Sequence, residues 1–230
     1  EMMIASRHGM TPVKTGDKIA GTRIIPLVIE EEKMQKACEV AGKEPIFRIL
    51  PYQKKKAGIV TTGSEVYYHR IEDKFTPVVI EKLKECGVTE VKQIQCNDDH
   101  EMITEAIQTL IEDGSDLIVC TGGMSVDPDD RTPLAIKNAC TEVVTYGAPV
   151  LPGAMFMLAY CEKEGRQIPV MGLPGCVMYA KRTIFDLVLP RIMCDEKLHE
   201  KDFRLLGQGG LCLSCPVCTF PNCGFGKGGY

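Results

Sequence analysis

The sequence has no run of about 18 apolar residues, which is the length that a membrane-spanning helix needs. Its most apolar stretch, 148–161, is too short and contains Pro149, Pro152 and Gly153. It also has no excess of positive charge, because 27 Lys and Arg stand against 31 Asp and Glu, a net charge of −4. We therefore expect neither a membrane protein nor a general nucleic-acid binder.

The sequence also lacks the amino-acid composition of a disordered chain. Charged residues make up 25% and hydrophobic residues 44% of the 230 residues, which is ordinary for a globular protein. This length is enough to bury a sizeable core. The first residues show no signal-peptide pattern, and the chain opens on Glu1. We expect a cytoplasmic protein, and we expect that a portion upstream of Glu1 is missing.

Cysteine, by contrast, is abundant, with twelve residues. In a chain of this length with an α/β pattern, we interpret them as signs of a reducing compartment and a metal rather than of disulfides. Eight are spread from Cys38 to Cys194, and four form a C-x2-C-x2-C-x4-C pattern near the end. Four thiolates so close together can hold Zn²⁺ or an iron–sulfur cluster, and the alternative is a flexible reduced tail. The predicted ligands are Cys212, Cys215, Cys218 and Cys223.

Apolar periodicity predicts alternating strands and helices from residue 57 onward. Buried-type strands are expected at 58–61, 91–95, 116–120 and 169–172. Helices are expected at 75–86, 97–112, 133–140, 153–161 and 175–189. Thr132 is the predicted N-cap of the third. This order favours a mostly parallel sheet with helices on its faces. The preceding residues form a β-rich flank, with strands at 24–29 and 46–50 and a helix at 31–41.

Three loops follow predicted strands, at the edge where open parallel sheets bind ligands. They are 62–65, 121–133 and 172–176. The second contains paired glycines, which can form an N–H nest for an anion, and three Asp residues, which suit Mg²⁺. The plain alternatives are simple turns for the first and third loops and helix-dipole complementation by the three Asp residues. For Asp98, which precedes another helix, the plain alternative is capping.

Taken together, these loops resemble the molybdopterin-binding domain family of molybdenum cofactor biosynthesis, which includes MogA, MoaB, MoeA and gephyrin. The resemblance covers about residues 57–192. It is closest to MoeA, because Gly-Gly-Met-Ser-Val is similar to the MoeA pattern GGVSV, and Thr-Gly-Ser-Glu to TGDE. The matching segments are Thr61–Glu65, Asn97–Asp99, Thr121–Val126 with Asp130, and Leu173–Gly175.

The resemblance implies a three-layer α/β/α fold for a domain at 57–192, between a partial flank at 1–56 and a Cys-rich tail at 193–230. It implies molybdopterin in its adenylylated form as ligand, with Mg²⁺ and molybdate, and a homo-oligomer, either a trimer or a dimer. The implied activity is MoeA-like insertion of molybdate with release of AMP. By position, the functional acids are Asp98, Asp130 and Glu65. The implied ligand contacts are Thr62, Gly63, Ser64, Thr121, Gly122, Gly123, Met124, Ser125, Pro174 and Gly175.

Three features depart from MoeA. The loop that reads LPGNP there has Cys176 and Val177 in its last two places here. Only residues 193–230 follow the domain, too few for the β-barrel-like domain that ends MoeA. Neither MogA nor MoeA has the Cys cluster. Two other functions therefore stay open: a non-catalytic molybdopterin carrier or sensor, and a CinA-like nucleotide hydrolase, which shares the fold.

Overall fold

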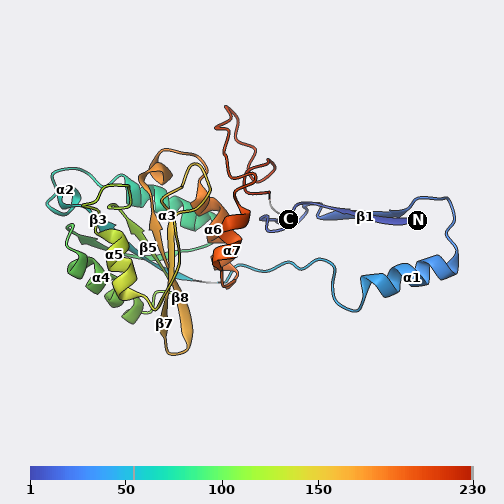
Figure 1. Cartoon of the computed structure of the whole chain (residues 1–230), viewed down its shortest axis with the longest axis horizontal. Coiled ribbons are helices and arrows are strands. Elements are labelled where there is room, and N and C mark those ends of the chain that lie inside the picture. The colour runs from blue at the N-terminus through green and yellow to red at the C-terminus, as the bar shows by residue number, and fades with distance from the viewer. Residues whose placement is uncertain (54, 229–230) are drawn as a thin grey trace. The chain divides into compact units, whose positions relative to one another are not determined.

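The computed structural model describes residues 1–53 and 55–228. The chain divides into two compact units, Glu1–Pro51 and Tyr52–Tyr230 (Figure 1). In the first unit, β1 (Met2–Ser6) pairs antiparallel with β2 (Ala20–Ile24), and α1 (Glu31–Ala41) confirms the predicted helix. The strand predicted at 24–29 is wrong beyond Ile24, since Pro26 lacks the N–H that a ladder needs. The strand predicted at 46–50 is also wrong, because this extended segment has no partner strand in the described part of the unit.

The second unit is built on one sheet with the strand order β4-β3-β5-β8-β7-β6. The strands β4, β3, β5 and β8 run parallel, whereas β7 is antiparallel to both of its neighbours. The prediction of a mostly parallel sheet is therefore confirmed. The bounds are β3 (Lys56–Thr62), β4 (Glu90–Cys96), β5 (Leu117–Thr121), β6 (Glu142–Tyr146), β7 (Met157–Lys163) and β8 (Arg166–Leu173).

Helices cover both faces of this sheet, as the three-layer prediction requires (Figure 1). The core therefore consists of two clusters, one on each face of the sheet. In β3, Ile59 packs in the cluster of α3 and α6, and its neighbour Val60 packs in the cluster of α4 and α5. None of the helices in the described ranges has the length and apolarity of a transmembrane span. Their bounds are α2 (Ser64–Tyr67), α3 (Phe75–Glu85), α4 (His100–Glu112), α5 (Thr132–Ala139), the 3₁₀ turn η1 (Gly175–Met178), α6 (Ile184–Met193) and α7 (Glu200–Leu205).

Two helix predictions in this unit need correction. Segment 153–161 contains the start of β7 instead of a helix. Leu158 faces one core cluster and Ala159 the other, so the strand is buried on both sides and its apolar run has no period that distinguishes it from a helix. The helix predicted at 175–189 is divided into η1 and α6, because Thr183 and Asp186 form a capping box that starts a new helix.

Candidate functional site

The loops after β3 and β4 are joined by a side chain. The backbone N–H of Ser64 donates to Oδ2 of Asp98 at 2.9 Å. Gly63 makes the turn between β3 and α2 with φ at 130°, a conformation that favours glycine. Glu65, the third predicted acid, is exposed in α2. The carboxylate of Asp98 thus fixes the start of α2 against the end of β4.

Asp99, and not Asp98, caps α4. Oδ1 of Asp99 accepts hydrogen bonds from the backbone N–H groups of Glu101 at 2.8 Å and Met102 at 3.3 Å. The alternative that Asp98 serves as the cap is therefore wrong. The two neighbouring acids therefore differ in role: Asp99 caps α4, and Asp98 joins the loops after β3 and β4.

This division of tasks predicts different effects on stability. Replacing Asp99 by Ala is expected to lower the free energy of unfolding by about 1 kcal/mol, because two N–H groups lose their acceptor. Replacing Asp98 by Ala is expected to lower it less, by about 0.5 kcal/mol, because only one N–H group, that of Ser64, loses its acceptor. Urea unfolding of both variants measures the difference. An equal loss of unfolding free energy in both variants would contradict the assignment of the cap to Asp99.

The glycine pair after β5 is pressed against the end of β3 and the start of α5. A Cβ added at Gly122 would lie 2.7 Å from Oγ1 of Thr62 and closer still to the Thr62 carbonyl oxygen. One added at Gly123 would lie 2.7 Å from Oγ1 of Thr132. Both glycines have positive φ, at 88° and 54°. Side chains are therefore excluded here on two grounds, backbone conformation and space.

Buried threonine hydroxyls hold this loop in place. Oγ1 of Thr62 donates to the Thr121 carbonyl oxygen at 3.2 Å and lies 3.1 Å from Oγ1 of Thr132. Thr132 in turn donates to the Gly122 carbonyl oxygen at 2.9 Å. Arg131 occupies the N-cap position of α5, so the prediction that Thr132 is the N-cap is wrong.

The side chains of Thr62 and Thr121 are buried, at 5% and 0% exposed. Within the described ranges, the Thr121 hydroxyl has no hydrogen-bond partner. Both residues were predicted as ligand contacts, yet their hydroxyls lie inside the domain.

Asp130 closes the rest of the loop. Its Oδ2 accepts from the backbone N–H of Ser125 at 2.5 Å and from the Ser125 hydroxyl at 2.8 Å. The N–H of Asp127 donates to the same hydroxyl at 3.2 Å, which tightens the turn. Burial and the negative charge of Asp130 raise the pKa of Tyr146, at the end of β6. Asp130 therefore sets the position of Ser125 and faces a phenol.

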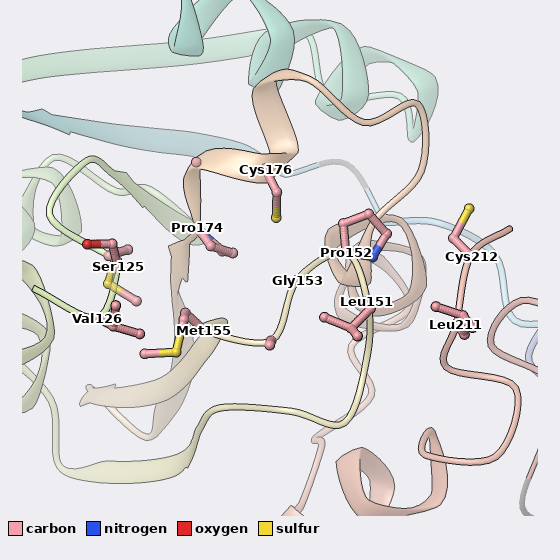
Figure 2. A pocket seen from close by; sticks show the side chains of 13 residues that line it. Ser125, Val126, Leu151, Pro152, Gly153, Met155, Pro174, Cys176, Leu211 and Cys212 are labelled. Carbon is pink, nitrogen blue, oxygen red and sulfur yellow. The ribbon is translucent and has the colours of Figure 1, made fainter. Parts of the chain in front are cut away.

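The loops after β5 and β8 meet at a pocket of about 510 Å³ (Figure 2). This volume lies in the range of sites for small molecules and cofactors. Four predicted contacts line it: Met124, Ser125, Pro174 and Gly175. The other predicted residues do not, and these are Thr62, Gly63, Ser64, Glu65, Asp98, Thr121, Gly122, Gly123 and Asp130.

Two walls of the pocket were not predicted from the sequence. One is 151–155, which precedes β7, and the other is Leu211 with Cys212. These walls are joined, because the N–H of Leu151 donates to the Gly210 carbonyl oxygen and the N–H of Cys212 to the Leu151 carbonyl oxygen, each at 2.8 Å. The Pro and Gly residues at 149–153 are a loop signal that could have indicated the first wall.

Cys176 directs its sulfur into the pocket between Pro174 and Gly153 (Figure 2). Burial raises the pKa of this thiol, so the protonated form is favoured. The residue stands where the MoeA pattern has Asn. The pocket therefore presents a soft, weakly polar group at the place where that pattern presents an amide.

The described residues do not bring together the predicted metal ligands. Across 1–53 and 55–228, no three His, Cys, Asp or Glu side chains are arranged to hold a metal ion. Cys212 and Cys223 pack against the apolar core of the α3 and α6 face, whereas Cys215 and Cys218 are exposed. The four-thiolate site therefore stays a prediction.

A three-layer α/β domain with glycine-rich loops at the carboxyl edge of its parallel strands defines a ligand-binding protein of the doubly wound class. The family model described as "Probable molybdopterin binding domain" matches residues 58–193, more than half of the chain. The chain belongs to this family. The resemblance deduced from its loops is thus confirmed at the family level, whereas closeness to MoeA stays a prediction.

The chain is similar to several known proteins. A CinA-like protein of Mycobacterium tuberculosis (strain ATCC 25618 / H37Rv) is 35% identical over 85 residues, which are 37% of this chain and 20% of the relative. A CinA-like protein of Mycobacterium avium (strain 104) is 34% identical over 95 residues, 41% of this chain and 22% of the relative. The chain thus spans about a fifth of the length of these curated relatives.

Among solved structures, a proposed molybdenum cofactor biosynthesis protein from Corynebacterium diphtheriae matches with a TM-score of 0.50 at 14% identity. The match covers 62% of this chain and 97% of that one. The tungsten cofactor synthesizing protein MoaB from Pyrococcus furiosus has a TM-score of 0.47 at 22% identity, covering 54% and 84%. At these identities, the first match supports the fold alone.

Proposed function

We propose that this chain binds molybdopterin at the pocket between the β5 and β8 loops and acts in the biosynthesis of the molybdenum or tungsten cofactor. One observation carries the proposal. Met124 and Ser125 in one loop, and Pro174 and Gly175 in another, are implied ligand contacts about 50 residues apart in the sequence, and they line a single cavity. Membership of the molybdopterin-binding family supports this ligand.

The lining suits a flat heterocycle. Met124, Val126, Leu151 and Pro174 offer apolar surface to the faces of a pterin ring, as the walls of cofactor sites commonly do. Ser125, held by Asp130, adds a polar group at a fixed position. In this proposal, Gly175, which lines the pocket and has open space at its Cβ position, allows the backbone to approach the phosphate end of the ligand.

For the reaction, we keep MoeA-like insertion of molybdate into adenylylated molybdopterin, with release of AMP. Asp98 and Asp130 each direct one carboxylate oxygen to a backbone N–H, which leaves a second oxygen as a donor of the type that Mg²⁺ prefers. Bound there, Mg²⁺ would neutralise charge on the ligand phosphates. The part of this chain's own residues is to orient the ligand. Glu65, the third implied acid, does not form a metal-holding group with Asp98 and Asp130 within the described residues.

An experiment with two arms and three possible outcomes tests the function. The full chain is given molybdopterin in one arm and adenylylated molybdopterin with molybdate and Mg²⁺ in another. Release of AMP together with active cofactor supports the enzyme. Tight binding without turnover supports a carrier or sensor. If neither pterin binds, the proposal is wrong.

Replacing Asp130 by Asn tests the polar side of the pocket. We expect molybdopterin binding to weaken about tenfold, because the loss of charge weakens the two hydrogen bonds that position Ser125. Asp129→Asn is the matched control, since in the described part of the chain only its backbone N–H is bonded within the loop. Isothermal titration measures both variants. Equal affinity of Asp130→Asn and the unchanged chain would contradict this role for Asp130.

A CinA-like nucleotide hydrolase is the second candidate. It is favoured by the curated relatives, which are CinA-like proteins at 34–35% identity. The test is to supply nucleoside diphosphate compounds with Mg²⁺ and to follow release of nucleoside monophosphate. Hydrolysis without molybdopterin binding would replace the first proposal by this one.

A further inference from the structure

Two cysteines outside the pocket lie in close contact. Cys140 ends α5 and Cys161 lies in β7, and their Sγ atoms are 2.6 Å apart. Both are thiols in this structure. A disulfide bond joins its sulfurs at about 2.05 Å, so only a small movement separates the pair from bonding distance. The proposed function assigns no role to either thiol.

The backbone beside the pair is fixed on both sides. The N–H and the hydroxyl of Thr141 both donate to the Tyr160 carbonyl oxygen, each at 3.0 Å. The Cys161 thiol lies 3.3 Å from the Ala139 carbonyl oxygen. Residues next to each cysteine are therefore bonded to one another, which holds the two sulfurs close together.

We propose that Cys140 and Cys161 form a reversible disulfide by exchange with a low-molecular-weight disulfide such as oxidised glutathione. The Cys140 thiolate attacks one glutathione sulfur, and the glutathione S–S bond breaks to release one glutathione thiolate, which takes up a proton. The Cys161 thiolate then attacks Sγ of Cys140 and expels the second glutathione. The protein loses two protons and two electrons, and one oxidised glutathione takes them up to become two reduced molecules.

Access to solvent fits this order of steps. Cys140 is half-buried, whereas Cys161 is 4% exposed, so the reagent meets Cys140 first. The hydrogen bond from Cys140 lowers the pKa of Cys161 and raises that of Cys140. The raised pKa of Cys140 makes the opening attack the slower step. In the mixed disulfide Cys140 has no S–H left to donate, so the closing attack is favoured by the proximity of the two sulfurs, and we expect little of the mixed disulfide to accumulate.

The bond would join two elements that lead away from the pocket. Helix α5 begins at Thr132, which bonds to the Gly122 loop, and β7 follows the pocket wall at 151–155. Oxidation would tie the far end of α5 to β7. This inference does not depend on the proposed ligand.

The reduced full chain is incubated in glutathione buffers of rising oxidation, quenched with iodoacetamide and digested with trypsin. Cleavage after Lys137 and Lys163 leaves both cysteines, and no other, in one peptide. We expect this peptide to lose two hydrogens and to carry no alkyl group. Digestion after Glu142 then gives two fragments that stay linked until reduced. A peptide carrying two alkyl groups in oxidised buffer would overturn the proposal.

Variants add a second measurement. Oxidation is expected to raise the melting temperature by roughly 5–10 °C, since it closes a loop of about 20 residues. Cys140→Ala and Cys161→Ala are expected to abolish the rise, whereas Cys120→Ala, in the same core cluster, keeps it. A rise that persists in Cys140→Ala would assign the effect to other thiols and contradict the proposal. The peptide analysis of the unchanged chain needs no variant to fold.

Discussion

Replacing Gly122 by Ala is expected to destabilise the domain by about 3 kcal/mol and to abolish measurable molybdopterin binding. Part of the loss comes from the positive φ of 88°, which costs a non-glycine residue about 1–2 kcal/mol. The rest comes from the added Cβ, which meets the backbone carbonyl of Thr62 at the end of the interior strand β3. Since β3 is paired on both sides, the loop must move away, and it carries Met124 and Ser125 out of the pocket with it.

The control for this prediction is Gly175→Ala. Gly175 lines the same pocket, yet a Cβ there meets nothing within 4 Å and φ is not positive. We expect its free energy of unfolding to change by less than about 0.5 kcal/mol. Chemical denaturation and ligand titration of both variants give the comparison. If Gly122→Ala unfolds and binds like Gly175→Ala, the close packing of the loop on β3 is not a requirement.

The parallel half of the sheet could be predicted because its strands carry a direct signal. The strands β3 and β5 are short apolar runs that end in glycine-containing loops, and each is followed by a helix with a regular apolar face. Four loop residues that line the pocket followed from the same pattern, since parallel strands bring their carboxyl ends to one edge.

The antiparallel half carried no such signal. The strand β7 is buried on both faces, so its sequence has neither the alternation of a half-exposed strand nor a helical period. The wall at 151–155 and the contact with Leu211 and Cys212 depend on tertiary pairing across about 60 residues of sequence. Short-range patterns do not contain that information.

The roles of the acids were only half predictable. Sequence position correctly placed Asp98 and Asp130 in loops at the carboxyl ends of the parallel strands. It could not show that Asp98 bonds to Ser64 of another loop, or that the neighbouring Asp99 takes the helix cap. Both residues have the same chemistry, and only the backbone geometry distinguishes them. The metal site at the Cys cluster stays a prediction, and its spacing could not show that Cys212 and Cys223 pack against the core.

The second large effect is expected at Asp186, which lies at the start of α6. Its carboxylate accepts from Nζ of Lys82 at 2.7 and 2.9 Å, from Arg182 at 2.8 Å and from the N–H of Thr183 at 2.7 Å. The Lys82 and Asp186 side chains are 9% and 4% exposed. Lys82 also donates to the Lys181 carbonyl oxygen at 3.1 Å. This buried network fastens α3 to the segment between η1 and α6, which follows the pocket residue Cys176.

Replacing Asp186 by Ala is expected to lower the free energy of unfolding by about 3–5 kcal/mol, because the Lys82 ammonium is left buried without its counter-charge. Glu85→Ala is the matched control. It removes the exposed partner of Arg182, and a loss below about 1 kcal/mol is expected. The double variant Lys82→Met with Asp186→Asn separates charge from packing. If the buried charge is the cause, this double variant is more stable than Asp186→Asn alone, and denaturant unfolding measures the order. If it is less stable, the loss belongs to lost packing and hydrogen bonds around Asp186, and the charge argument is wrong.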